Sequence, residues 1–132
     1  MIAINNNLKG TIGELRVSLE LLNNGWEVFL PVSDFSPIDL IAYNNYKTVR
    51  IQVKYRKLDT RGIIEIPFSS VVNGKKVPID KLNIDYTAVV SDDLPYIVYI
   101  PTELILDRKV ISFRPSTLAQ RSEFWRVNQI GI

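Results

Sequence analysis

The chain has 132 residues, 46% of them apolar and 23% charged, with a net charge of +2, which suits one domain over residues 1–132 that buries a core without staples. It contains neither cysteine nor histidine, and this excludes disulfides, thiol chemistry, imidazole acid–base catalysis and the usual zinc sites. The oxygen ligands that remain favour magnesium, manganese or calcium.

The first predicted element is an amphipathic helix. Its apolar residues recur at spacings of four and three, which indicates one helical stripe, and these residues are Leu8, Ile12, Leu15, Leu19 and Leu22. Residues 23–25, Asn-Asn-Gly, supply a C-terminal stop. Glu14 lies about 120° from the centre of the stripe, beside Val17 and Leu21, so it has reason to face a partner group. Val17 and Leu21 indicate a second packing surface, which could be a subunit interface.

Three strands follow the helix. Residues 26–31 predict the first strand and residues 32–37 a polar loop. Residues 38–43 predict a second, nearly all-apolar strand, which a turn at 44–47 joins to a third. Apolar and polar residues alternate over 49–56, as they do in a half-buried strand.

The second and third strands carry polar residues where a purely structural strand has none. Asp39 begins the second strand, and Gln52 and Lys54 lie side by side on the polar face of the third. A carboxylate, an amide oxygen and a lysine at neighbouring strand positions suit binding of a divalent metal and activation of a water against a phosphate.

The rest of the chain predicts further strands with small helices. Strands are expected at residues 63–68, 86–90 and 96–100, a brief helix at 101–105 and a final helix at 116–125. The Asn73–Gly74 pair predicts a tight hairpin turn within residues 71–77. Together these elements predict a mixed α/β layer.

Basic residues gather in two tracts, residues 47–61 and 108–126. Basic density beside a candidate metal site favours a polyanionic partner. No segment reaches the roughly 18 apolar residues that a membrane span needs, and the N-terminus lacks the charged start and long apolar run of a signal peptide. We therefore expect a cytoplasmic protein with no membrane partner.

An ordered set of motifs resembles the PD-(D/E)XK nuclease fold. The set is Gly10-Thr11-Ile12-Gly13-Glu14, then Gly25-Trp26, then Ser36-Pro37-Ile38-Asp39-Leu40-Ile41, then Gln52-Val53-Lys54. It covers residues 9 to about 57. The resemblance implies a restriction-endonuclease-like α/β fold, a mixed sheet flanked by helices, and hydrolysis of phosphodiester bonds in double-stranded DNA.

The resemblance also implies a role for each motif residue. Asp39 matches the acid that bridges the metal, and Glu14 matches the helix acid that adds a ligand directly or through water. Gln52 stands at the acidic position of the last motif and would offer its side-chain oxygen, while the main-chain carbonyl of Val53 is a further ligand. Lys54 matches the lysine that orients the attacking water or stabilises charge at the phosphate. The implied cofactor is Mg²⁺, with Mn²⁺ as an alternative, and Ca²⁺ is expected to bind without supporting cleavage.

DNA contacts are expected from basic side chains near this site. The candidates are Lys9, Arg56, Lys57, Arg61, Lys75 and Lys76. The hairpin that carries the last two could enter a major groove, or could be a solvated turn that protects an edge strand. Cleavage of two strands requires two active sites, so a homo-oligomer, dimer or tetramer, is expected. The candidate interface residues are Val17, Leu21, Phe124, Trp125 and Ile130, although completion of the core also accounts for Phe124 and Trp125.

Two branches of the fold match most closely. Archaeal Holliday junction resolvases share the lysine–glycine and glutamate of the first helix and the later aspartate. Intron-encoded homing endonucleases of this fold share these residues and also the glutamine of the last motif, where the common pattern has Asp or Glu. Gln52 therefore favours a site-specific homing endonuclease, with a resolvase or another repair or restriction nuclease as the alternative. A second alternative is a DNA-binding module that retains the fold without cleavage.

Overall fold

A five-stranded sheet forms the centre of the molecule. The computed structural model describes residues 5–33, 35–79, 82–106 and 108–131. The strand order is β1-β2-β3-β7-β8, with β1 at Glu27–Phe29, β2 at Leu40–Asn44, β3 at Lys47–Tyr55, β7 at Tyr86–Val90 and β8 at Val98–Pro101. β3 and β7 run parallel and the other neighbours antiparallel. The sheet is therefore mixed, and the predicted mixed α/β layer is confirmed.

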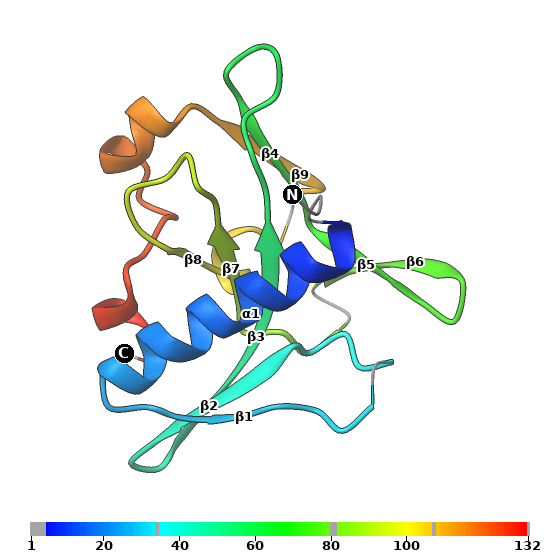
Figure 1. Ribbon diagram of the computed structural model, residues 1–132, viewed down its shortest axis with the longest axis vertical. Helices are drawn as coiled ribbons and strands as arrows, with labels where there is room; N and C mark the ends of the chain where they lie inside the picture. Colours follow the sequence, from blue (N-terminus) through cyan, green and yellow to red (C-terminus); the bar gives the residue numbers. More distant parts are fainter. Residues whose placement is uncertain (1–4, 34, 80–81, 107, 132) are drawn as a thin grey trace.

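The helix α1 (Asn6–Asn23) covers one face of this sheet (Figure 1). Asn5 caps its start, because the Asn5 side chain accepts a hydrogen bond of 2.9 Å from the backbone N–H of Leu8. At its end the Asn24 side chain donates to the Glu20 carbonyl, and Gly25 turns the chain with φ of +87°, a conformation that favours glycine. The predicted helix and its stop are confirmed.

The face of α1 that packs on the sheet differs from the sequence expectation. Gly13, Val17 and Leu21 are its buried residues, whereas Leu15 and Leu19 are each 60% exposed. The leucine stripe thus faces away from the sheet, and the face that the sequence offered as a possible subunit interface is the core face. The physical reason is close approach: a Cβ at Gly13 would lie 3.3 Å from Val53 of β3, so the helix packs through its smallest residue.

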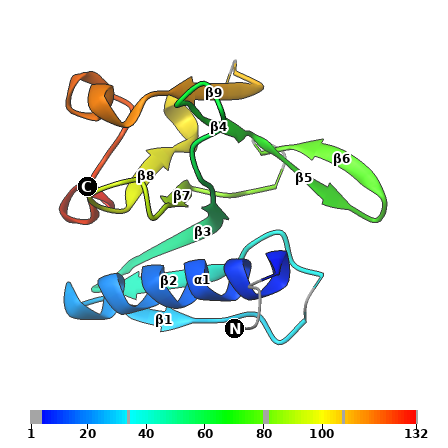
Figure 2. The ribbon, with the colours of Figure 1, turned by 45° about the horizontal axis from the view of Figure 1, so that its top comes forward.

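A second core lies on the other side of the sheet. The two-stranded sheet of β4 (Ile64–Pro67) and β9 (Val110–Phe113) packs there, opposite α1, as Figure 2 shows. Three short 3₁₀ helices, η2 (Thr102–Leu104), η3 (Pro115–Gln120) and η4 (Val127–Gln129), complete the C-terminal part. β9 was not expected from the sequence.

The predicted final helix over residues 116–125 is wrong. Only the 3₁₀ helix η3 forms, and a turn at residues 122–123 follows it before Trp125. Trp125 exchanges two backbone hydrogen bonds with Tyr99 of β8, of 2.8 and 2.9 Å. This long-range pairing competes with a helix for the same backbone groups, and no local pattern announces it.

The interface candidates of the sequence are core residues in the structure. Val17 and Leu21 are 0% exposed and Ile130 is 4% exposed, so none of them offers a surface to a partner. Phe124 and Trp125 are half-buried and pack against the two cores, and Phe124 stacks edge-on against Phe113. The alternative that the sequence left open, completion of the core, is the correct one.

The hairpin β5 (Ser69–Val72) and β6 (Lys75–Pro78) projects from the body of the molecule (Figure 1, Figure 2). Its turn residues Asn73 and Gly74 both have positive φ, 52° and 76°, as expected for the tightest hairpin turns. The predicted hairpin is confirmed.

Candidate active site

The four candidate residues converge from three elements. Asp39 lies immediately before β2, Gln52 and Lys54 lie on β3, and Glu14 lies on the buried side of α1. The antiparallel pairing of β2 with β3 sets the position of Asp39 relative to Gln52 and Lys54. It continues to Asp39, whose backbone N–H donates to the Ile51 carbonyl at 3.0 Å. The Asp39 carboxylate in turn accepts a hydrogen bond of 2.7 Å from the backbone N–H of Val53.

The helix brings a second carboxyl group to Asp39. The Glu14 side chain interacts with that of Asp39, and this interaction lowers the pKa of Asp39. The neighbouring Gly13 lets α1 approach β3 closely enough for Glu14 to come near Asp39. A Cβ at Gly13 would lie only 3.3 Å from Val53 and 3.4 Å from Tyr55. A close pair of partly buried carboxyl groups is costly without a proton or a cation between them.

Gln52 is buried, with 5% of its surface exposed, although the strand alternation placed it on a polar face. Its amide nitrogen donates to the Pro37 carbonyl at 3.1 Å, and this bond assigns the nitrogen and oxygen of the amide. The Oε1 atom is buried and accepts no hydrogen bond among the described residues. A buried acceptor without a donor costs free energy. This oxygen is therefore suited to coordinate a metal ion, which would satisfy it.

Lys54 is held at the base of the hairpin. Its Nζ atom donates to the Ser69 carbonyl at 3.3 Å. One of its three donors is thereby engaged, and the others remain for a phosphate or a water. The amine therefore links the centre of the site to the first residue of β5.

Burial dominates the electrostatics of the site. Desolvation raises the pKa of Asp39, opposed by the Val53 N–H, Glu14 and Lys54. Desolvation also lowers the pKa of Lys54, and the charge of Arg56 adds to this effect while Asp39 opposes it. Both pKa shifts disfavour the charged forms of these side chains. A bound divalent cation would instead favour the charged form of the carboxyl groups.

The donor set fits a magnesium-type ion. Among the described residues no group of three or more Asp, Glu, His or Cys side chains could hold a metal, so a site here needs oxygens of other kinds. The carboxyls of Asp39 and Glu14 together with the orphan oxygen of Gln52 supply hard oxygen ligands from three elements. Such ligands suit Mg²⁺, Mn²⁺ or Ca²⁺. A role for the Val53 carbonyl stays a prediction.

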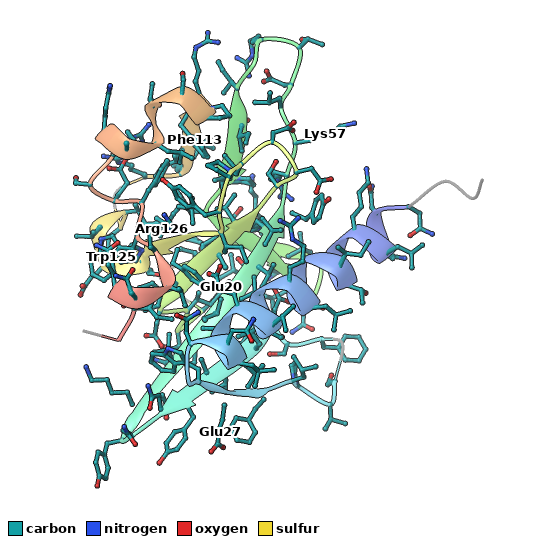
Figure 3. The ribbon with its side chains drawn as sticks, turned by 60° about the vertical axis from the view of Figure 1, so that its left-hand side comes forward. Glu20, Glu27, Lys57, Phe113, Trp125 and Arg126 are labelled. Carbon is teal, nitrogen blue, oxygen red and sulfur yellow. The ribbon has the colours of Figure 1, made fainter. Side chains whose placement is uncertain are left out.

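The predicted DNA-binding residues fall into two groups. Lys57 is exposed just beyond β3 and lies at the opposite end of the view from Glu27 in Figure 3. Lys75 and Lys76 are exposed on the hairpin, whose base touches Lys54. Lys75 and Lys76 lie toward the turn of the hairpin, opposite Val72 and Val71, and the contact with Lys54 is at its other end, at Ser69.

Three other basic candidates are already engaged or partly covered. The Arg61 guanidinium pairs with Asp59 at 2.6 Å and with Glu65 at 3.5 Å. Arg56 is half-buried and donates to the Tyr55 carbonyl at 2.9 Å. Lys9 is half-buried in the first turns of α1. The structure does not bring Arg61 to the site as a free cation, and a DNA contact by it stays a prediction.

Sequence reasoning missed the main-chain partners of the site. The carbonyls of Pro37 and Ser69 orient Gln52 and Lys54, and main-chain groups carry no residue-type signal. It also missed the pair of Arg50 and Asp85, whose two side-chain hydrogen bonds of 3.0 and 3.1 Å tie β3 to the start of β7. The signal available was only the polar alternation of β3, which does not name a partner.

The mixed sheet has one helix packed on it and a carboxylate–amide–lysine cluster where β2 meets β3. These features place the chain in the class of restriction-endonuclease-like proteins. The family model of the PD-(D/E)XK endonucleases matches residues 4–128. The chain therefore belongs to the PD-(D/E)XK endonuclease family.

Solved structures share this fold at low sequence identity. A bacterial homing endonuclease, I-Ssp6803I, is 18% identical with a TM-score of 0.71, over 83% of this chain and 78% of the other. Hjc of Archaeoglobus fulgidus, a Holliday junction resolvase, is 18% identical with a TM-score of 0.62, over 92% of this chain and 94% of the other. No curated protein shows significant sequence similarity to the chain. In the described residues no helix is long and apolar enough to cross a membrane.

Proposed function

We propose that this chain is a metal-dependent DNA endonuclease that hydrolyses phosphodiester bonds at the Asp39 site. The observation that carries the proposal is the meeting of two interacting carboxyl groups, Asp39 and Glu14, with the unsatisfied oxygen of Gln52. Lys54 stands on the same strand face as Gln52. A structural role alone gives no reason to bury an acceptor without a donor beside two acids.

Each residue has a task in the proposed reaction. A divalent ion, Mg²⁺ first and Mn²⁺ second, would supply charge neutralisation and a more acidic water. Asp39 and Glu14 would hold that ion, with Gln52 giving a neutral oxygen. Asp39 is itself fixed by the Val53 N–H, so its orientation is set before any ligand arrives. Lys54 would donate to a phosphoryl oxygen or hold the attacking water, in place of its present bond to Ser69.

The positive surroundings support DNA as the substrate. Lys57 is exposed just beyond β3, and Lys75 and Lys76 are exposed on the hairpin whose base contacts Lys54, where they would neutralise phosphates along a bound DNA. The family is one of endonucleases, and this agrees with a polymeric substrate held in the middle of its length.

The test is a plasmid-nicking assay on the purified protein. Supercoiled DNA is incubated with Mg²⁺, with Mn²⁺, with Ca²⁺ and with EDTA. We expect nicked or linear DNA with the first two ions, and binding without cleavage with Ca²⁺. DNA binding without cleavage under any of these conditions would favour the remaining alternative, a non-catalytic DNA-binding module.

Within this activity we propose a site-specific, intron-encoded homing endonuclease. The glutamine of the last motif, Gln52, supports this branch, because the resemblance to homing endonucleases of the fold includes it. The alternative, a Holliday junction resolvase, is supported by the fuller coverage of both chains in the match to the archaeal resolvase, 92% and 94%.

Two substrates separate the branches. One is a set of plasmids that carry the intronless form of the host gene, and the other is a synthetic four-way junction with a linear duplex of the same sequence as control. Discrete bands from the plasmid with no junction preference are expected. Cutting of the junction in preference to the duplex, whatever the sequence, would instead establish the resolvase.

A further inference from the structure

The outer face of α1 carries an unpartnered apolar strip. We call it the leucine strip, and its exposed members are Leu8, Leu15, Leu19 and Leu22, with exposed fractions of 48%, 60%, 60% and 55%. In the part of the chain drawn as ribbon, no other element lies over this side of the helix (Figure 1, Figure 2). Contiguous apolar patches with polar rims on a folded protein mark interaction sites.

The spacing of the strip is that of a helix-pairing seam. With Ile12 included, its residues follow one another at intervals of four, three, four and three. This is the average repeat of 3.5 residues at which one helix packs along another. The monomer has no need of it, because the opposite face of α1, with Val17 and Leu21, already fills the core.

The geometry favours a second copy of this chain as the occupant. A seam of this repeat matches another helix with the same repeat, and α1 is the only α-helix among the described residues. We propose that two copies pair through their leucine strips, with the helices antiparallel about a two-fold axis at Leu15. A two-fold interface is self-complementary, and Leu15 is the middle of the strip, so Leu8 of one copy meets Leu22 of the other.

The charges of α1 select the antiparallel direction. About an axis at Leu15, Lys9 of one copy lies against the last turns of the other helix, which contain no basic residue and whose Glu20 accepts a hydrogen bond of 2.9 Å from the Tyr99 hydroxyl in its own copy. The negative end of that helix dipole attracts the same cation. Parallel helices would place the two Lys9 residues at the same end of the pair. Arg16, beside the strip, is neutralised within its own copy by Asp92 at 3.2 Å.

The role of this pairing in DNA cleavage rests on the proposed nuclease function. Glu14 lies on the same helix as the leucine strip but on the side that faces Asp39. A dimer through α1 therefore couples two active sites rigidly. An enzyme that cuts both strands of a duplex requires two such sites, whereas one copy alone would nick one strand.

Sedimentation of the metal-free, DNA-free protein tests the pairing without reference to cleavage. We expect a dimer at micromolar concentrations, and a monomer after Leu15→Glu with Leu19→Glu. Circular dichroism checks that this variant stays folded. Leu104→Glu is the matched control, because Leu104 is 47% exposed on η2, and it should leave the dimer intact. A monomeric wild type, or a dimer that survives the double change, would overturn the proposal.

Cysteine cross-linking tests the direction, since the chain has no cysteine of its own. Leu15→Cys should give a disulfide-linked dimer on oxidation, because its two sulfurs meet at the axis. Leu8→Cys alone should not, because its two copies lie about 20 Å apart along antiparallel helices. Mixed Leu8→Cys and Leu22→Cys proteins should cross-link to each other. Self-cross-linking of Leu8→Cys would contradict the antiparallel arrangement.

The cleavage readout is separate. If the proposed function holds, Leu15→Glu with Leu19→Glu should convert linear plasmid products into nicks while the nicking rate persists. If the protein is a dimer by sedimentation but cuts no DNA under any condition, the nuclease proposal fails and the pairing stands. If it cuts DNA as a monomer, the pairing fails and the nuclease proposal stands.

Discussion

Gln52 is the residue on which the chemistry of the site turns. It replaces the acid that the common family pattern carries, and its oxygen is buried without a donor. An amide contributes a neutral ligand where a carboxylate would contribute charge, so under the proposed function the site would hold a divalent ion chiefly through the carboxyls of Asp39 and Glu14. The substitution exchanges metal affinity for a lower repulsion among acids when no ion is bound.

Gln52→Glu should therefore shift the protein in opposite directions with and without metal. Without metal we expect a lower Tm, because a third buried acid joins Asp39 and Glu14. With Ca²⁺ we expect a larger rise in Tm than in the wild type, since a bound ion adds about 2.7 kcal/mol at roughly 100 times its Kd. Gln52→Met, of similar size without the oxygen, is the matched control and should reduce the Ca²⁺ shift. Equal Ca²⁺ shifts in all three proteins would remove Gln52 from the metal site.

At the level of elements, the fit of α1 on β3 places Glu14. Gly13 makes the contact, with Val53 at 3.3 Å from an added Cβ, while an added Cβ at Gly10 would meet no atom within 4 Å. The two glycines of one helix thus carry different tasks. Gly13 permits close approach, and Gly10 only costs helix propensity.

Gly13→Val should lower the cleavage rate by about 100-fold. The added side chain would push α1 away from β3 by up to about 1 Å and so move Glu14 away from Asp39. Gly10→Ala should leave cleavage unchanged and stabilise the protein by about 1 kcal/mol. Single-turnover cleavage and urea unfolding measure the two effects. Normal cleavage by Gly13→Val, with a normal fold, would show that the position of Glu14 is not set by this contact.

The hairpin β5–β6 is the second element with a testable task. Lys75→Ala with Lys76→Ala should weaken DNA binding for all sequences and reduce the salt slope of log K by about 2, if both lysines contact phosphates. Lys47→Ala, at the far end of β3, is the control and should leave the slope unchanged. Fluorescence anisotropy with a labelled duplex over a range of salt concentrations gives both slopes. An unchanged slope in the double variant would make the hairpin lysines a solvated turn.

Local sequence patterns predicted most elements, because most elements depend on interactions between residues close in sequence. The alternation of β3, the Asn73–Gly74 turn and the stop of α1 each depend on neighbours in sequence. The wrong face of α1 was expected because its apolar residues outnumber those of the true core face, where a glycine replaces bulk with proximity. The backbone bridge of Trp125 depends on Tyr99, which is distant in sequence. Likewise the ordered motifs named the four candidate site residues, whose roles stay a prediction, but the carbonyls that bond to Gln52 and Lys54 could not be predicted.

For the molecule as a whole, one helix joins the two proposals. Its buried side brings Glu14 to the site, and its outer side carries the leucine strip. In these proposals, catalysis at one copy and cutting of both strands by two copies depend on opposite sides of α1. The role of α1 in cleavage therefore depends on one central claim, that the Asp39 site hydrolyses DNA.

The most direct test of that claim is Mg²⁺-dependent, single-turnover plasmid cleavage by Asp39→Asn and Lys54→Ala, each compared with the wild type and with Lys47→Ala. We expect both site variants to lose roughly 100-fold or more in rate, with unfolding transitions like that of the wild type or above it. The control should cut at the wild-type rate. Cleavage at the wild-type rate by either site variant, or cleavage that persists in EDTA, would contradict the account.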